Sequence, residues 1–257
     1  MPVLVRKEIR QAWRSFRLPA LYIVLLFLAV LDPLSAKYMG EIISRFAQGI
    51  TIIMPPQSAE QALATFISDI VEIGLLIIIA ITMGSVAGEK ATGVTTFIVT
   101  KPASRKSYVL AKLAVLAGGL ALGIAASTLV ASLYTWTLLG PVSASRAALA
   151  ATSVGLYAEF ILAATFAASM VVSGTLAAGG LGLAVLAVAG IAGSVLSRSR
   201  IGPYLPSTLM GNASLFLTGA DVSKWTSVLL KPGLTTFLLS AGLLVAGFER
   251  FKRVELQ

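Results

Sequence analysis

Few residues in this sequence could do covalent chemistry. It has no His and no Cys, which excludes imidazole bases, thiolate nucleophiles and the zinc sites built on those ligands. Its Ser and Thr residues therefore lack a His partner, and no paired carboxylates stand at a metal-ligand spacing. The segment Gly88–Thr92 (GEKAT) lacks the upstream glycine and the four-residue loop of the phosphate-binding pattern GxxxxGK(S/T). We therefore expect no catalytic residue, no metal and no cofactor in this chain, and any ATP site must belong to another polypeptide.

A single carboxylate stands out among the apolar runs. Glu159 lies in the middle of a run at 148–172, and a carboxyl group at that depth in a membrane is costly, so it should face the interior of a helix bundle. It is our candidate for a group that lines a translocation pathway or relays protons. The alternative is a glutamic acid hydrogen-bonded to a neighbouring helix for packing.

The most charged interior segment is the candidate with the strongest signal. Residues 88–112 contain five basic residues and are punctuated by Gly93 and Pro102. The segment has room for one short helix lying across the ends of two membrane spans, where it could dock into a partner's groove. The alternative is a plain basic loop that only sets the topology.

The composition identifies the elements that must position these residues. Of the 257 residues, 57% are hydrophobic and 12% are charged, whereas soluble domains carry roughly a quarter charged residues. The mean hydropathy is +0.90. A water-soluble globule is thereby excluded, and the sequence predicts an integral membrane protein.

The apolar runs predict an all-α, polytopic fold. A helix needs about 20 mostly apolar residues to cross the hydrocarbon, and the chain offers six such runs. We expect a single transmembrane domain over 1–257 with spans at about 18–34, 70–87, 108–139, 148–172, 175–196 and 232–248. The third span carries a GxxxG pattern at Gly119 and Gly123, which favours close helix packing.

The N-terminal segment 3–17 has the pattern of an amphipathic helix. Its apolar side chains share one helical face, and four arginines form a stripe about 120° around from it. This pattern predicts an interfacial elbow whose arginines reach lipid phosphates; the alternative is an ordinary basic flank. The apolar face comprises Val5, Ile9, Ala12, Trp13 and Phe16, and the stripe comprises Arg6, Arg10, Arg14 and Arg17.

The basic residues predict the topology. With six spans, 13 of the 20 Lys and Arg residues fall on the side of both termini and of the 88–112 loop, and seven fall on the other side. Both termini should therefore be cytoplasmic. The basic residues of 197–231 weaken this bias. The apolar stretch Leu205–Leu217 is too short to cross, which indicates a re-entrant or interfacial segment there.

The 88–112 loop resembles the membrane subunits of type-2 ATP-binding-cassette (ABC) exporters. After their second span these proteins tend to carry a glutamate, a glycine a few residues on, a Pro-x-Ser-Arg element and a lysine. These positions read here as Glu89, Gly93, Pro102, Ser104, Arg105 and Lys112. The elbow, YLPSTL at 204–209 and the closing FERFKRVEL are similar to family features, so the resemblance runs along the whole chain. Val94 stands where a threonine is commoner, and the connection between the fifth and sixth spans is more basic than in the family.

The resemblance implies a specific assembly. Two copies, or one copy and a related permease, would form the pathway, and two cytoplasmic ABC ATPase subunits would bind ATP and Mg²⁺. Those subunits would grip residues 88–106 as a coupling helix. Glu89 and Arg105 would orient that helix, with Lys90 and Lys101 at its rim.

The sequence thus favours the permease subunit of an ABC exporter in the cell membrane, in contact with lipids and not with nucleic acid. One alternative is a stand-alone secondary transporter or channel that uses Glu159. Another is a non-transporting membrane scaffold. No inverted repeat relates the two halves, which argues against the secondary transporter.

Overall fold

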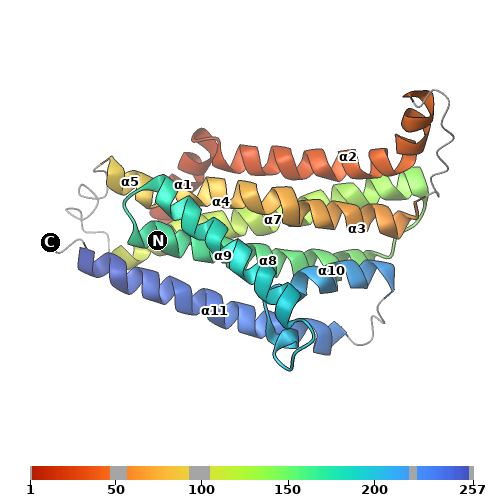
Figure 1. The fold of residues 1–257 in the computed structure, drawn as a ribbon. Helices are drawn as coiled ribbons and strands as arrows, with labels where there is room; N and C mark the ends of the chain where they lie inside the picture. Colours follow the sequence, from red (N-terminus) through yellow and green to blue (C-terminus); the bar gives the residue numbers. More distant parts are fainter. Residues whose placement is uncertain (1, 47–56, 93–104, 220–224, 255–257) are drawn as a thin grey trace.

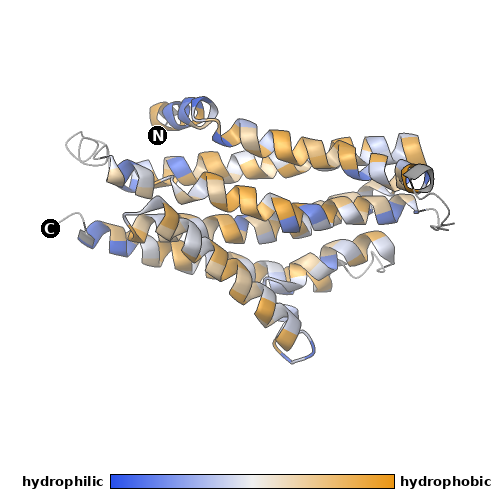
Figure 2. Cartoon of the chain, turned by 45° about the horizontal axis from the view of Figure 1, so that its top comes forward, coloured by the Kyte–Doolittle hydropathy of each residue, from blue (hydrophilic) through white to orange (hydrophobic). Residues whose placement is uncertain are grey.

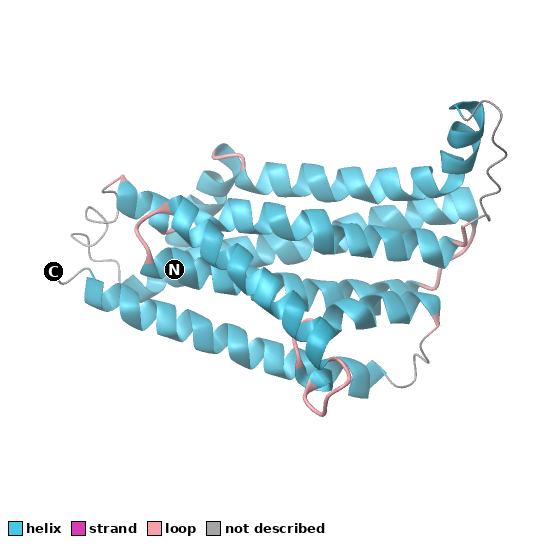
Figure 3. Cartoon of the chain, in the orientation of Figure 1, coloured by secondary structure: helices cyan, strands magenta, loops and turns pink. Residues whose placement is uncertain are grey.

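The chain folds into a bundle of long helices. The computed structural model describes residues 2–46, 57–92, 105–219 and 225–254, and within these ranges it consists of helices and loops without a strand (Figure 1 and Figure 3). Six stretches are long and apolar enough to cross a membrane: Arg17–Ile43, Ala59–Ala91, Arg105–Leu139, Ala144–Val171, Thr175–Leu196 and Val228–Arg253. The all-α fold with six spans is confirmed.

The two ends of the bundle differ in what they carry. The elbow α1 (Pro2–Arg14), the short α5 (Ala87–Ala91) and the C-terminal part of α11 (Trp225–Val254) lie at one end, which we call the terminal end (Figure 1). The opposite end carries the turn between α7 (Arg105–Leu139) and α8 (Ala144–Val171) and the end of α10 (Thr208–Thr218). Apolar residues dominate the middle of the long helices (Figure 2), as expected of segments that lie in lipid.

The helix α8 forms the centre of the bundle. In its most apolar stretch 72% of the residues are buried, against 17% in that of α9 (Thr175–Leu196) and 22% in that of α11. The sequence of α8 is rich in Ala, and such small side chains let neighbouring helices approach closely. The helices α9 and α11 instead expose large apolar side chains, such as Val188 and Phe237, each 66% exposed.

The second span begins earlier than its hydropathy predicts. We expected it to start at residue 70, but α3 (Ala59–Asp69) starts at Ala59 and continues through the π-helical turn η1 (Ile70–Gly74) into α4 (Leu75–Met83). Ser58 and Gln61 form a capping box: the Ser58 hydroxyl accepts from the Gln61 N–H at 3.2 Å, and the Gln61 side chain accepts from the Ser58 N–H at 2.9 Å. This cap satisfies the first free amides, so the helix starts in the polar segment.

Two other helices extend past their apolar runs. The first span was expected to end at 34, but α2 (Arg17–Phe46) continues to Phe46. The sixth was expected over 232–248 and is embedded in α11, which runs from Trp225 to Val254. Hydropathy locates the part of a helix that lies in lipid, whereas a helix continues beyond it as long as its backbone hydrogen bonds can form.

The elbow ends at a sharp turn. Its helix stops at Arg14, and Phe16 adopts a left-handed backbone with φ of 62° before α2 begins at Arg17. A residue with a Cβ is strained there by about 1–2 kcal/mol. The turn lets α1 pack across α2 and α7 instead of continuing the direction of α2.

The GxxxG pattern of α7 faces α2. A Cβ on Gly119 would stand 2.5 Å from Leu18 Cδ2, and one on Gly123 would stand 3.0 Å from Tyr22 Cε1. The two helices run parallel and in close contact at this point, because the glycines leave room for the α2 side chains.

Substituting Gly119 by Leu should therefore destabilise the bundle, by about 1–3 kcal/mol from overpacking. Gly118→Leu is a matched control, because no described atom lies within 4 Å of a Cβ at Gly118. The thermal unfolding midpoint in detergent should fall for Gly119→Leu only. Equal midpoints for the two variants would contradict the contact.

Candidate functional site

Both ends of the predicted coupling loop lie at the terminal end of the bundle. Glu89 and Lys90 belong to α5, and Arg105 is the first residue of α7. Gly93, Pro102 and Ser104, together with Lys101, lie outside the described residues. The structure therefore positions the entry and exit of the loop.

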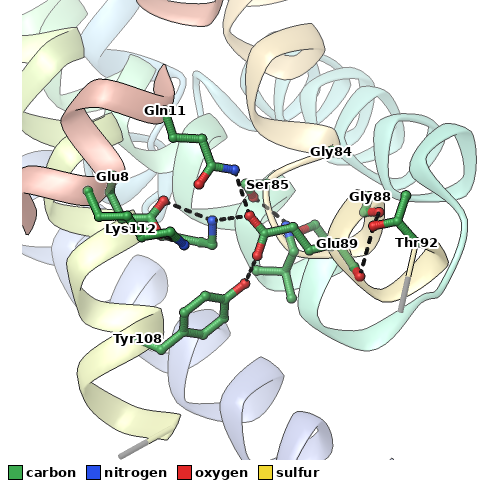
Figure 4. Close-up of polar contacts among 12 residues, drawn as sticks. Glu8, Gln11, Gly84, Ser85, Gly88, Glu89, Thr92, Tyr108 and Lys112 are labelled. Atoms are coloured by element: carbon green, nitrogen blue, oxygen red, sulfur yellow. Dashed lines mark hydrogen bonds and ion pairs between the residues drawn. The ribbon is translucent and has the colours of Figure 1, made fainter. Parts of the chain in front are cut away.

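Glu89 is the centre of a polar cluster that joins three helices (Figure 4). Its Oε1 accepts hydrogen bonds from Lys112 Nζ at 2.6 Å and from Gln11 Nε2 at 2.8 Å, and its Oε2 accepts one from the Tyr108 hydroxyl. Lys112 Nζ also pairs with Glu8 Oε2 at 2.8 Å. The elbow α1, the loop helix α5 and the start of α7 are thereby connected through one ammonium group.

The cluster is almost fully removed from solvent. Lys112 is 2% exposed, Glu8 5% and Glu89 8%. Removing charges from water is costly unless each is paired and hydrogen-bonded, and here one buried cation lies between two buried carboxylates. Lys7 offsets the excess negative charge from the rim, with its Nζ 3.0 Å from Glu8 Oε1. Because each buried carboxylate depends on Lys112, the three helices are held in one arrangement.

A second set of contacts joins α5 to the other side of the bundle. Lys90 Nζ donates to the Met170 carbonyl of α8 and lies 5.0 Å from the centre of the Phe251 ring of α11. Just before α5, the Ser169 hydroxyl accepts from the Val86 N–H at 3.1 Å and contacts the Ser85 hydroxyl at 3.2 Å. The short helix is thus fixed between the elbow and the ends of α8 and α11, so a force applied to it would reach all of these helices.

The elbow arginines lie on two surfaces. Arg6, Arg10 and Arg14 are exposed and line an open groove of about 810 Å³ along α1. Arg17 instead donates from Nη2 to the Gly84 carbonyl at 3.1 Å, at the bend between α4 and α5.

The elbow aromatics point away from the bundle core. Trp13 is 51% exposed and Phe16 61% exposed, and Trp13 contacts the Tyr22 ring edge-on at a centroid distance of 6.0 Å. Exposed aromatics beside exposed arginines are the arrangement expected where a helix lies at a membrane surface.

Glu159 lies apart from the polar cluster. It sits in the middle of α8 and is half-buried, and no hydrogen bond or ion pair joins it to another side chain in the described part of the chain. The structure therefore does not bring the two candidate sites together.

Sequence reasoning missed three members of the cluster: Glu8, Gln11 and Tyr108. The spacing contains a partial signal, because Glu8 and Gln11 are three residues apart and Tyr108 and Lys112 are four apart, so each pair shares a helix face. Lys112 links the two helices, because its Nζ pairs with both Glu8 and Glu89, which are 81 positions apart in the sequence. No local pattern encodes that contact.

Comparison with known proteins supports the membrane assignment. No family model matches this chain. It is 29% identical over 266 residues to the uncharacterized transmembrane protein YxlG of Bacillus subtilis (strain 168), with 99% of this chain and 98% of that protein covered. With its six apolar helices, this chain is a multi-pass membrane protein that is similar along its whole length to another transmembrane protein.

Proposed function

We propose that this chain is the permease subunit of an ABC transporter, an exporter driven by separate cytoplasmic ATPase subunits. The observation that carries the proposal is the fixed position of α5. Glu89 is bound by Lys112, Gln11 and Tyr108 from two other helices, and Lys90 contacts α8 and α11.

This arrangement suits a subunit moved by a partner. A loop that transmits the movement of an ATPase subunit must be held firmly against the membrane helices, because otherwise the loop would move without them. The buried ion cluster provides such a joint at the entry of the loop. The chain has no phosphate-binding loop, so ATP and Mg²⁺ would bind to the two partner subunits.

The proposed topology places the terminal end in the cytoplasm of the cell. It follows from the basic residues that collect there, including the elbow arginines and both ends of the 88–106 loop. A second copy, or a related permease, would complete the pathway. The exposed apolar surfaces of α9 and α11 would contact that subunit and the membrane lipids.

The test is purification from the native host in mild detergent, followed by mass spectrometry of the bound proteins. We expect a stoichiometric soluble partner that carries a GxxxxGK(S/T) loop. Recovery of the chain alone or as a homo-oligomer, under conditions that preserve other membrane complexes, would contradict the proposal.

Glu159 favours a second candidate, a secondary transporter that works alone. An unpaired carboxyl group in the middle of a membrane helix is a common site of ion coupling. In that case Glu159→Gln would abolish ion-coupled transport by the purified chain in vesicles. The permease proposal expects no such transport without ATPase subunits, so the two proposals give opposite results in this assay.

A further inference from the structure

The fifth crossing of the membrane is made by two helices. The helix α9 starts at the terminal end, where Gly84 lies against Thr175, and crosses the bundle obliquely (Figure 1). After Leu196 the chain turns through a loop and the short 3-10 helix η2 (Gly202–Tyr204), and α10 then continues to the opposite end. There Arg146 Nη1 donates to the Leu217 carbonyl at 3.5 Å, next to the start of α8.

The break between the two helices lies deep in the membrane. Thr235 Oγ1 donates to the Tyr204 carbonyl at 2.5 Å, and Thr235 is about 10 Å along α11 from Val228 at 1.5 Å per residue. The neighbouring Gly233 lies against Leu156, near the middle of α8. With Val228, the start of the apolar span, as the edge of a hydrocarbon layer about 30 Å thick, η2 lies about 10 Å inside that layer. Irregular backbone at that depth is tolerated only where protein buries it or where it lines a water-filled cavity.

A pocket with a mixed polar and apolar lining opens beside this break. It has a volume of about 690 Å³ and lies between α9, η2, α10 and α11. Gly190 on α9 leaves part of its wall open, because a Cβ there would have no described atom within 4 Å. Its polar lining comprises Ser194, Ser197, Ser207, Thr208, Asn212 and Lys231.

The lining and its surroundings are positively charged. The Ser207 hydroxyl is buried and has no hydrogen-bond partner in the described residues. Lys231 is the one charged residue among the described residues that line the pocket. It is exposed, with its Nζ 5.9 Å from the centre of the Tyr204 ring. Arg198 and Arg200, also exposed, lie on the loop that enters η2, so the charge around the pocket is positive.

The surroundings of the pocket are apolar. On α9, Ile191 and Val195 flank the glycines and are 63% and 72% exposed, and on α11 Leu230 and Leu234 flank Lys231 and are 58% and 61% exposed. A ligand that reaches the pocket from this side arrives through the hydrocarbon. Positive charge and hydroxyl donors inside an apolar rim suit an amphiphile with an anionic head.

We propose that this pocket binds the phosphate-bearing headgroup of an anionic phospholipid, with the Lys231 ammonium as the donor to the phosphate oxygens. The acyl chains would lie along the exposed apolar surfaces of α9 and α11. This site goes beyond the proposed function, because binding needs neither ATP nor a partner subunit.

The test measures phosphatidylglycerol bound to the purified full chain by native mass spectrometry, with phosphatidylcholine as the comparison lipid. Gly190→Leu should place a bulky side chain in the pocket and displace the headgroup from Lys231, which should lower phosphatidylglycerol binding about tenfold, as expected for loss of a charge-assisted contact. Gly180→Leu is the matched control, because Gly180 is an exposed glycine on the same helix with equally open space and does not line the pocket. Lys231→Gln should remove the preference for phosphatidylglycerol over phosphatidylcholine, whereas Lys37→Gln, at the opposite end but outside the pocket, should retain it.

Two results would overturn the proposal. One is equal phosphatidylglycerol binding by Gly190→Leu and Gly180→Leu. The other is displacement of the lipid by equimolar inorganic phosphate, which would make the ligand a free anion. Neither measurement involves ATP hydrolysis, so failure of this site and failure of the permease proposal are distinguishable.

Discussion

Replacing Lys112 by Met should destabilise the folded chain by about 3–5 kcal/mol, the usual cost of removing one partner from a buried ion pair. Met keeps the length and most of the volume of the side chain, so little of this cost comes from a cavity. The loss arises because Glu89, 8% exposed, stays buried without its cation, and Glu8, 5% exposed, keeps only the exposed Lys7. The thermal midpoint of the purified chain in detergent should fall on the order of 10 °C.

A surface ion pair provides the control for this prediction. Lys252 and Glu249 pair at 2.6 Å at the same end of the bundle, but their side chains are 43% and 53% exposed. Such pairs contribute about 0–1 kcal/mol, so Lys252→Met should leave the midpoint nearly unchanged. Lys112→Met with Glu89→Gln should cost less than the sum of the two single changes, because the second change removes the stranded charge. Additive costs would show that Lys112 and Glu89 do not act as a pair.

The sequence predicts the parts of this fold that depend on local patterns. The fifth long helix was expected over 175–196 and is Thr175–Leu196, because Ser173 and Gly174 end the preceding run clearly. The start of the second span at Ala59 was not predicted, although Ser58 and Gln61 have the residue types of a capping box. Residues 59–69 are too polar for hydropathy to assign them to a span.

The candidate site was only half predictable, for a physical reason. Glu89 and Lys112 were identified through a family pattern, whereas Glu8 and Gln11 were not, since their roles depend on how the elbow packs on α7. The segment Leu205–Leu217 was expected to be re-entrant or interfacial, and most of it forms α10; the break at η2 before it was not expected. Its depth follows from the contact between Tyr204 and Thr235, which joins different helices and leaves no periodic signal in either.

If the chain is the proposed permease, charge reversal at Arg105 should abolish its stimulation of the partner ATPase, a loss of at least about tenfold, as expected when one partner of a close charged contact is inverted. Arg105 is the first residue of α7, at the entry to a helix whose N-terminal dipole disfavours positive charge. The dipole by itself would therefore favour a glutamate at this position.

A comparison of Arg105 with its neighbour Lys106 separates an effect on ATPase stimulation from an effect on the stability of α7. Lys106 follows Arg105 in the first turn of α7 and is exposed, so Lys106→Glu makes the same change of charge in nearly the same field. If Arg105 orients the coupling loop, Arg105→Glu loses ATPase stimulation in the reconstituted complex while Lys106→Glu keeps most of it, with equal membrane insertion and thermal midpoints. If both reversals reduce stimulation equally, the loop acts only through its overall positive charge. If neither reversal reduces stimulation, the ATPase subunits act on another part of the bundle, and the buried cluster around Glu89 serves to hold the elbow in place.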